Sequence, residues 1–450
     1  MRLRKKMPVP PSRPSLTLEL VMGKAMAKRA DGWRRASLLS CVLACGLPGC
    51  LKAGRAPVPA TEQYSLELSA STLAQGANRE IVGLAFTDSG KYLVARFADA
   101  TVGVFEFRTG RLCAITAHPD RLFWRVTTPD GHRYMASECG SRFQLRPDES
   151  GPYAKRLLTT SALALGIVDY DAALGSGFLV GSCFRQPLRL WDLTRWEAVS
   201  MPDSEDGEAY APRFLRGGSF LLHSGHYYAV SVWSLEKMAI TGLFAWPEEC
   251  GEESWYASIY VCPNESWCVC IGPGGALAVL DLTTAYEPAP ARAENDELHI
   301  DAILRGVWAS DVAFGQGDAL AFVTAGKEVR LWRRRPFIDC VGVLACALPR
   351  PPGEQRGVVA LRPEDKYLVH SCGAAFEVHS LRPPQRPVLM VVATPGPGEY
   401  AAYTPHGHFR ASKGAQTHIR FRRGSRTYTP AEYARVFRWH NRPEAVQLPD

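Results

Sequence analysis

The chain has 450 residues, and its 46% hydrophobic and 22% charged residues are the composition of a folded protein, not of a disordered or collagen-like chain. The formal net charge of +7 is unevenly placed, because ten Lys/Arg lie in residues 1–50 and nine lie in residues 395–450. The body from Leu51 to Thr394 carries a net charge of −6, which argues against nucleic acid as a partner.

Residues 1–50 have the three parts of an export signal. Four bases lie between Lys28 and Arg35, and an uncharged, mostly apolar run follows from Ala36 to Leu47. As a helix this run would rise about 18 Å, which is too short for a hydrocarbon core of about 30 Å. We therefore expect a signal peptide and not a membrane-spanning helix. Because signal n-regions are short, we hypothesise that translation starts at Met26, with Met22 as the alternative.

The end of this leader, Leu47-Pro48-Gly49-Cys50, resembles a bacterial lipobox, in which the cysteine takes a diacylglycerol and becomes the new N-terminus. The resemblance implies lipidation at Cys50, with Cys45 as second choice. The alternatives are an ordinary cleaved signal and a mistranslated extension in front of a cytoplasmic protein. We expect a lipid-anchored protein of the cell envelope, periplasmic or on the outer-membrane face, with residues 51–63 as a flexible tether.

From residue 64 onward one unit repeats: an apolar alternating strand, a turn with Asp, Gly or Pro, a second strand, a short turn and a third strand. The clearest unit runs from Val82 to Ile115, with turns at Thr87–Lys91 and Ala98–Thr101. Four short strands within roughly 40–50 residues make one propeller blade. The other units are Phe123–Leu145, Ile167–Leu193, Phe214–Leu235, Ile259–Leu282, Val312–Trp332 and Val358–Leu381. Residues 64–394 are therefore predicted to form an all-β, seven-bladed propeller of four-stranded antiparallel blades.

One blade ending carries a family resemblance. Leu190-Trp191-Asp192-Leu193, together with Asp99 in the turn before a strand, resembles the WD40 repeat family over residues 64–394. The repeat is degenerate, because only one Trp-Asp pair occurs and the Gly-His pair of that family is nearly absent. The resemblance implies tryptophans packed on the neighbouring sheet, turn aspartates that hold hairpins, and rim loops that bind proteins or peptides. The predicted structural anchors are Asp99, Phe105, Trp191, Asp192, Trp233 and Trp332.

Residues 395–450 differ from the blades. Thr429, Pro430 and Glu432 predict an N-cap, a first-turn proline and an early acid, so a helix of about ten residues should start there. Tyr433 and Phe437 would share one face of it. The segment resembles the one that follows WD repeats in some bacterial multidomain proteins, including proteins with caspase-like peptidase domains. The resemblance implies a short mixed α/β extension, which we expect to pack on the propeller.

The cysteines of the body predict packing and not metal chemistry. Most lie in apolar runs, and in Trp267-Cys268-Val269-Cys270 the two-residue period sends both sulfurs to one face. Cys340 and Cys346 are a candidate disulfide pair in an exported protein. No Cys-x-x-Cys with matching His or Cys partners occurs.

Other polar features have structural interpretations. His406 and His408 would share one face of a strand but lack a third metal ligand. Gly272–Gly275 is predicted to be a hairpin turn, since no lysine and helix follow it. The acidic run 203–208 is predicted to be a solvated loop, with calcium binding as the alternative. The basic clusters 333–335 and 420–423 are predicted to be exposed faces, with an anionic lipid or an acidic partner as the alternative.

Together these features predict a monomeric, non-catalytic propeller scaffold without cofactor or metal. It would bind an unidentified protein or peptide through its rim loops and the membrane through its anchor, but not nucleic acid. The alternative is a propeller enzyme, lactonase-like or quinoprotein-like. That function requires acidic or histidine ligands from several blades to meet around calcium or a quinone in the central channel.

Overall fold

The computed structural model describes much of the compact unit Gln63–Asp450. The described residues are 65–68, 80–117, 122–139, 142–148, 152–161, 165, 167, 169–182, 187–199, 209–225, 230–247, 258–272, 275–286, 297–305, 307, 309–315, 319–324, 328–333, 338–345, 357–364, 366–382, 386–393, 398–423 and 425–448. The leader with Cys45 and Cys50, the tether, the acidic run and Cys346 lie outside them. The predictions made for those segments stay predictions.

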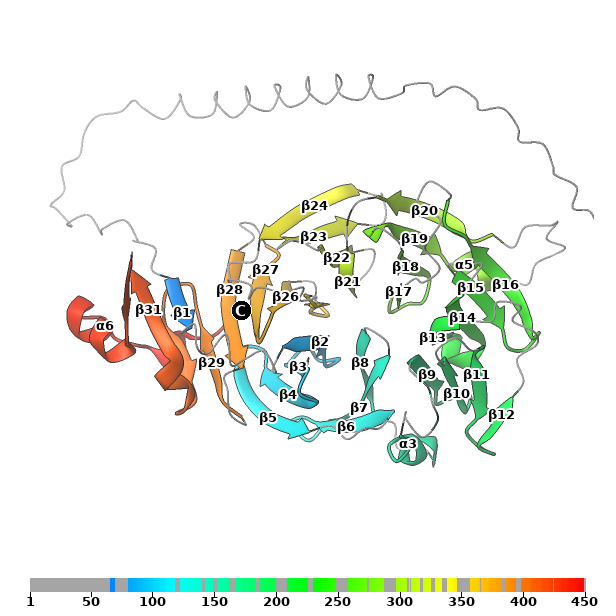
Figure 1. Cartoon of the computed structure of the whole chain (residues 1–450), viewed down its shortest axis with the longest axis horizontal. Coiled ribbons are helices and arrows are strands. Elements are labelled where there is room, and N and C mark those ends of the chain that lie inside the picture. Colours follow the sequence, from blue (N-terminus) through cyan, green and yellow to red (C-terminus); the bar gives the residue numbers. More distant parts are fainter. Residues whose placement is uncertain are drawn as a thin grey trace, which may run out of the picture. The chain divides into compact units, whose positions relative to one another are not determined.

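The described strands form eight antiparallel sheets, and seven of them follow one another in chain order around a ring (Figure 1). We number these seven sheets 1 to 7. Sheet 1 is β2 (Ile81–Phe86), β3 (Tyr92–Phe97), β4 (Thr101–Glu106) and β5 (Arg111–Ala117), and sheet 2 is β6 (Phe123–Thr127), β7 (Arg133–Cys139) and β8 (Arg142–Pro147). Sheet 3 is β9 (Asp169–Ala173), β10 (Phe178–Ser182), β11 (Arg189–Asp192) and β12 (Glu197–Val199), and sheet 4 is β13 (Ala209–Leu215), β14 (Phe220–Gly225), β15 (Val230–Ser234) and β16 (Ala239–Phe244).

Sheets 5 to 7 continue the ring. Sheet 5 is β17 (Ser258–Val261), β18 (Trp267–Ile271), β19 (Leu277–Asp281) and β20 (His299–Leu304), and sheet 6 is β21 (Ala309–Phe314), β22 (Ala319–Thr324), β23 (Glu328–Arg333) and β24 (Ile338–Ala345). Sheet 7 is β25 (Val359–Leu361), β26 (Tyr367–Cys372), β27 (Ala375–Ser380), β28 (Arg386–Ala393), β29 (Tyr400–Tyr403) and β30 (Phe409–Ala411). Short helices are α3 (Pro152–Leu157), α5 (Thr283–Tyr286) and the 3-10 turns η2 (Arg216–Gly218), η5 (Ala415–His418) and η6 (Pro443–Ala445).

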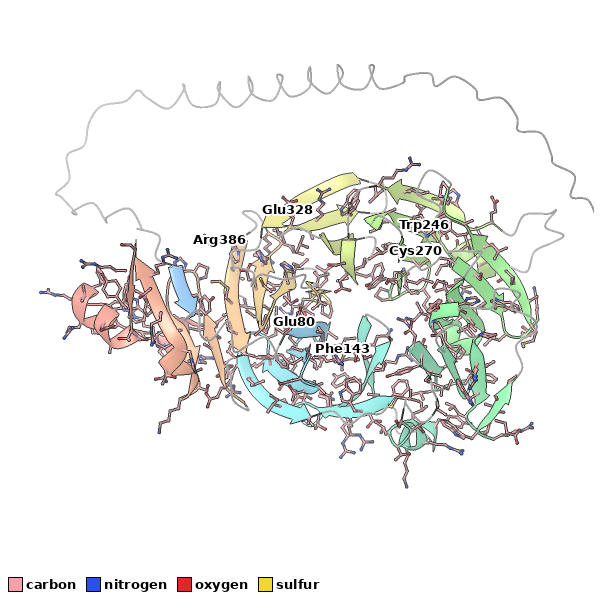
Figure 2. All side chains as sticks on the ribbon, in the orientation of Figure 1. Glu80, Phe143, Trp246, Cys270, Glu328 and Arg386 are labelled. Atoms are coloured by element: carbon pink, nitrogen blue, oxygen red, sulfur yellow. The ribbon has the colours of Figure 1, made fainter. Side chains whose placement is uncertain are left out.

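Both faces of the blade strands are apolar because each sheet lies between two others. In β18, Trp267 and Val269 belong to the core shared with sheet 6, whereas Cys268 and Cys270 belong to the core shared with sheet 4. Figure 2 labels Cys270 on this sheet. The two-residue period of a strand produces this division. The prediction that both sulfurs are buried on one face is confirmed.

Every pair of neighbouring sheets shares a buried hydrophobic cluster. Representative members are Val104 with Trp124 (sheets 1 and 2), Phe123 with Trp191 (2 and 3), Ala173 with Trp233 (3 and 4), Leu222 with Cys270 (4 and 5), Val269 with Trp332 (5 and 6), Val329 with Leu368 (6 and 7) and Phe105 with Phe376 (7 and 1). The last pair closes the ring, with ring centroids 5.2 Å apart. At the same junction the Ile81 N–H donates to the Gly373 carbonyl at 2.9 Å. A closed ring of radially packed antiparallel sheets is a β-propeller.

Sheet 2 departs from the expected four strands. Its described residues form three strands, and the last of them, β8, contacts β2 on the inner side of the ring. Its strand order therefore runs inward, whereas the order in sheet 1 runs outward (Figure 1). The close approach of β2 to β8 requires glycine at position 83, because a Cβ there would overlap the Cβ of Phe143. On the outer side, α3 contributes Ala154 and Leu157 to the core between sheets 2 and 3.

The C-terminal extension is joined to the propeller in two ways. Strands β29 and β30 continue sheet 7, so the expected boundary at residues 394 and 395 falls within one six-stranded sheet. Val446 and Leu448 return to the core that closes the ring, where the Leu448 N–H donates to the Arg108 carbonyl at 2.7 Å. The extension thus packs on the junction of sheets 7 and 1.

The rest of the extension is a small sheet covered by a helix. Strand β31 (Ile419–Arg423) lies between β32 (Arg426–Tyr428) and β1 (Ser65–Leu68), so residues 65–68, expected within the propeller, pair with the extension instead. Helix α6 (Pro430–Phe437) begins at the predicted N-cap, where Thr429 and Glu432 form a reciprocal capping box. The predicted start is confirmed, and the helix has eight residues. Among the described residues, no helix is long and apolar enough to cross a membrane.

Candidate binding site on the inner strands

Three aspartates on the inner strands hold neighbouring sheets together. Asp169 and Asp171 on β9 accept backbone N–H groups of β13, from Ala211 at 2.7 Å and from Phe214 at 2.8 Å. Asp311 on β21 accepts the N–H of Val359 on β25 at 2.8 Å. All three are buried, and a buried carboxylate is stable only when such donors satisfy it. In each case the acid reaches the first strand of the next sheet.

Arg146 extends this connection to a third sheet. From β8 its guanidinium donates to Asp171 at 2.5 Å, to the Ala172 carbonyl at 2.5 Å and to Gln144 at 3.2 Å. Sheets 2, 3 and 4 are thus joined in a row through Arg146, Asp171 and the Phe214 N–H. The Arg146 side chain keeps 34% of its surface exposed, so the fixed guanidinium is accessible from solvent.

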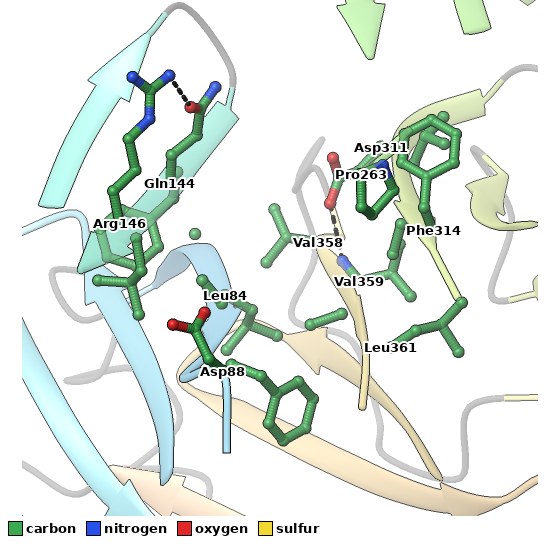
Figure 3. A pocket seen from close by; sticks show the side chains of 18 residues that line it. Leu84, Asp88, Gln144, Arg146, Pro263, Asp311, Phe314, Val358, Val359 and Leu361 are labelled. Carbon is green, nitrogen blue, oxygen red and sulfur yellow. Dashed lines mark hydrogen bonds between the residues drawn. The ribbon is translucent and has the colours of Figure 1, made fainter. Parts of the chain in front are cut away.

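Arg146 lies at the edge of a pocket of about 390 Å³, which we call the inner pocket (Figure 3). Strands β2, β8, β21 and β25 line it, so it collects residues from sheets 1, 2, 6 and 7. Most of its lining side chains are apolar, and its polar side chains are Asp88, Gln144, Arg146 and Asp311, but polar atoms contribute slightly more of its accessible surface than apolar atoms do. A pocket of this volume that combines apolar side chains with a few fixed polar groups is a candidate ligand or peptide site.

A second pocket of about 350 Å³, the rim pocket, shares Arg146 with the inner pocket. Phe214, Gly217, Gly218 and Glu265 line its other side. Gly218 has φ +97°, and a Cβ there would lie 2.7 Å from the Cβ of Ala173. Glycine is therefore required at this position of the pocket wall, in the loop after β13.

Arginines stack on aromatic rings at two places, one beside the rim pocket and one at helix α3 on the outer side of the ring. Arg216 lies over Tyr286 at 4.0 Å, and Arg156 lies over Trp196 at 4.5 Å. Burial, with the nearby Glu265 carboxylate, raises the pKa of Tyr286 above its usual range, so its hydroxyl stays neutral and donates to the Glu265 carbonyl at 2.7 Å. Arginine and aromatic side chains are the residue types that dominate protein–protein binding energy.

The predicted turn aspartates hold hairpins. Asp99 accepts the Thr101 N–H at 3.1 Å, and Asp192 accepts the Thr194 N–H at 2.7 Å. The bonds from Thr194 lower the pKa of Asp192. Asp281 accepts the Thr283 N–H at 2.8 Å in the same kind of turn, although the sequence analysis did not predict this role. The available signal was the repeated Asp-Leu-Thr at 192–194 and 281–283.

The predicted aromatic anchors each lie in the core shared with the preceding sheet: Phe105, Trp191, Trp233 and Trp332. Trp233 also donates its indole N–H to Nε2 of His223 at 3.1 Å. The other imidazole nitrogen then carries the proton and donates to the Ser224 carbonyl at 3.2 Å. Burial lowers the pKa of His223 to about 4, so this histidine is neutral at pH 7.

Three acids of the inner strands, Asp169, Asp171 and Asp311, have partners within the fold. The acids that meet on the inner strands accept backbone N–H groups, and within the described ranges no three His, Cys, Asp or Glu side chains are arranged to bind a metal. His406 and His408 lie in the turn between β29 and β30, so the expectation that they share a strand face is wrong. His408 stacks on Trp439 with ring centroids 5.8 Å apart, which is a packing role.

No protein-family model matches this chain, and no curated protein matches it. Among solved structures, the chain is similar to the β-propeller domain of Cps50 (Swd1) from Myceliophteria thermophila, with 14% identity over 69% of this chain and 96% of that one at a TM-score of 0.46. It is also similar to the RRP9 WD40 repeats, with 16% identity, 70% and 92% coverage and a TM-score of 0.43. A third is KlHsv2 with loop 6CD replaced by a Gly-Ser linker, with 13% identity, 67% and 93% coverage and a TM-score of 0.44. The propeller assignment rests on the closed ring of sheets and not on these likenesses.

Proposed function

We propose that the protein is a non-catalytic scaffold of the WD40 type, a monomer held at the cell envelope, that binds a segment of a partner protein at the inner pocket. The observation that carries the proposal is the adjacency of the inner and rim pockets, which share the fixed, one-third-exposed Arg146. An extended peptide could cross from one pocket to the other. Its carbonyl or carboxylate groups would accept from Arg146, and its apolar side chains would lie against Phe314 and Leu361.

The test compares two charge-matched variants as bait for the envelope fraction. Asp88→Lys with Arg146→Gln alters the pocket. Glu197→Lys with Arg386→Gln changes the same charges at exposed positions on sheets 3 and 7. A partner retained by the unaltered protein should be retained by the second variant and lost by at least tenfold with the first, since a central arginine commonly contributes about 1–2 kcal/mol or more.

Equal retention by both variants would contradict a site at the inner pocket. A stoichiometric calcium ion or quinone chromophore in the purified protein would contradict the scaffold assignment itself and favour the enzymatic alternative.

A further inference from the structure

The extension carries a charge opposite to that of the propeller. Residues 395–450 have a net charge of +5, whereas residues 51–394 have a net charge of −6. Exposed bases include Arg422 and Arg426 on the β31–β32 hairpin and Arg435 and Arg438 at α6. Two of the few acids of the extension are committed to local bonds. Glu432 accepts the Thr429 N–H at 2.8 Å, and Glu399 accepts the Ala415 N–H at 3.0 Å.

Arginine is concentrated at the tip of this hairpin. Arg423 is the cross-strand partner of Arg426, and Arg422 is the partner of Thr427 in the adjacent register position. The packed side of this small sheet is held by aromatic contacts, with Phe421 stacked on Tyr433 at 4.4 Å. The Arg422 and Arg426 side chains lie outside this aromatic cluster and are exposed. Their exposure, and not a lack of contacts within the fold, makes them accessible to an anionic surface.

The N-terminal part of the chain joins the structure at this same hairpin. Strand β1 lies beside β31 (Figure 1), and its first residue, Ser65, is the register partner of Arg422. Fourteen residues, 51–64, separate it from Cys50. Fully extended, they reach at most about 50 Å. A membrane that holds the leader is therefore covalently kept within that distance of the arginines, and such a tether raises the effective concentration of the surface.

We propose that the β31–β32 hairpin docks on a surface of anionic phospholipid. Guanidinium groups bind phosphate oxygens by paired, charge-assisted hydrogen bonds, and an anionic leaflet attracts basic segments. The same surface repels the acidic propeller. The docked protein is thus oriented with its extension toward the lipid and its inner strands away from it. The inference does not depend on the proposed pocket function, and it uses the proposed tether only to identify which surface is near.

The test uses the chain from Leu51 to Asp450 without acyl groups, because it contains the whole compact unit Gln63–Asp450. Its binding is measured by co-sedimentation with vesicles of phosphatidylcholine plus phosphatidylglycerol and with vesicles of phosphatidylcholine alone. Arg422→Glu with Arg426→Glu should weaken binding to the anionic vesicles by at least about thirtyfold, from about 1 kcal/mol for each arginine near such a surface. The matched control, Arg195→Glu with Lys237→Glu, makes the same charge change in exposed loops of sheets 3 and 4 and should bind as the unaltered chain does.

Circular dichroism establishes that both variants are folded, and Arg422→Gln with Arg426→Gln, which introduces no new charge, should give a smaller loss in the same direction. The proposal is overturned if the hairpin variant and the control lose affinity equally, or if neutral vesicles bind as tightly as anionic ones. It is also overturned if soluble polyglutamate binds the hairpin more tightly than the vesicles do, since that result would assign the surface to an acidic polypeptide. The hairpin substitutions leave the inner pocket unchanged, so this result and that of the pocket test are independent.

Discussion

The propeller and its C-terminal extension use charge in opposite ways. In the propeller, Asp169, Asp171 and Asp311 point into the fold and accept backbone N–H groups of the next sheet. In the extension, Arg422 and Arg426 are exposed on a two-stranded hairpin. Buried acids of the propeller thus link neighbouring sheets, whereas these two bases of the extension lie at its surface.

The two regions also differ in how they are packed. The propeller has a mixed aliphatic and aromatic core between each pair of sheets, so each sheet is stabilised from both sides. The extension has a single cluster dominated by aromatic rings, in which Trp439 lies 5.0 Å from Phe421 and 5.8 Å from Tyr433. Removal of one aromatic side chain should therefore lower the stability of the whole propeller, whereas in the extension it should lower only the stability of the extension.

The largest effect should follow from replacing a buried ring in each region. Trp267→Ala should lower the free energy of unfolding of the propeller by about 3–5 kcal/mol, because the fully buried indole fills the core between sheets 5 and 6. Phe421→Ala removes an equally buried ring but should release mainly β31, β32 and α6. Chemical denaturation reports the first effect, and hydrogen exchange of the extension reports the second. An equal loss of propeller stability in both variants would contradict the division into two regions.

Lowering the pH should destabilise the propeller through the buried His223. His223 has a pKa of about 4 in the folded protein against 6.5 for the free side chain, so unfolding takes up a proton between these values. Stability should be at its full value above pH 6.5 and fall by about 3 kcal/mol as the pH is lowered to 4, because one pKa unit corresponds to about 1.4 kcal/mol. Denaturant titrations across this range measure the slope.

His223→Gln is the control for that slope, since glutamine can accept from Trp233 but does not titrate. Its stability should be less dependent on pH over the same window. If the slope is the same in both proteins, another group is responsible for it.

The inter-sheet acids should have intermediate effects. Asp311→Ala leaves the buried Val359 N–H without its acceptor and should cost about 1–3 kcal/mol. Asp171→Ala should cost at least as much, because it also removes the partner of Arg146. A double-mutant cycle with Arg146→Gln measures the coupling between the two side chains. A coupling indistinguishable from zero would show that Arg146 does not join sheet 2 to sheet 3.

The smallest effect should come from the helix cap of the extension. Thr429→Ala removes the acceptor of the Glu432 N–H and the hydroxyl that helps to lower the pKa of Glu432. It should destabilise α6 by about 1 kcal/mol while the ring is unaffected. Hydrogen exchange of α6 measures the loss, and Thr427→Ala, an exposed position on β32, is the matched control.

The sequence predicted the features that depend on local pattern. The strand units, the burial of Cys268 and Cys270 and the cap at Thr429 follow from periodicity and capping chemistry, which involve residues close in the chain. The inward order of sheet 2 was not predictable in this way. It depends on β8 packing against Gly83 of β2, which lies some sixty residues earlier. The pairing of Ser65 with Arg422 is more distant still, and a strand pattern alone carries no information about its partner.

The candidate site was less predictable than the fold. Arg146, Asp171 and Asp311 come from three sheets, and their sequence spacings are set by the loops between blades. A weaker signal was present, since an acid inside an apolar strand, as in Asp169-Tyr170-Asp171-Ala172, must find donors when it is buried. Such a pattern predicts that hydrogen bonds exist but not which sheet supplies them.

If the sheets form one closed ring, the junction between sheets 7 and 1 should be as stable as the other junctions. Native-state hydrogen exchange of the Ile81 amide, which donates to the Gly373 carbonyl across that junction, measures this stability. In a closed ring this amide exchanges as slowly as those of the buried strand β3, and only through global unfolding. Exchange at the rate of an exposed loop, with β3 still protected, would show that the ring is open between sheets 7 and 1.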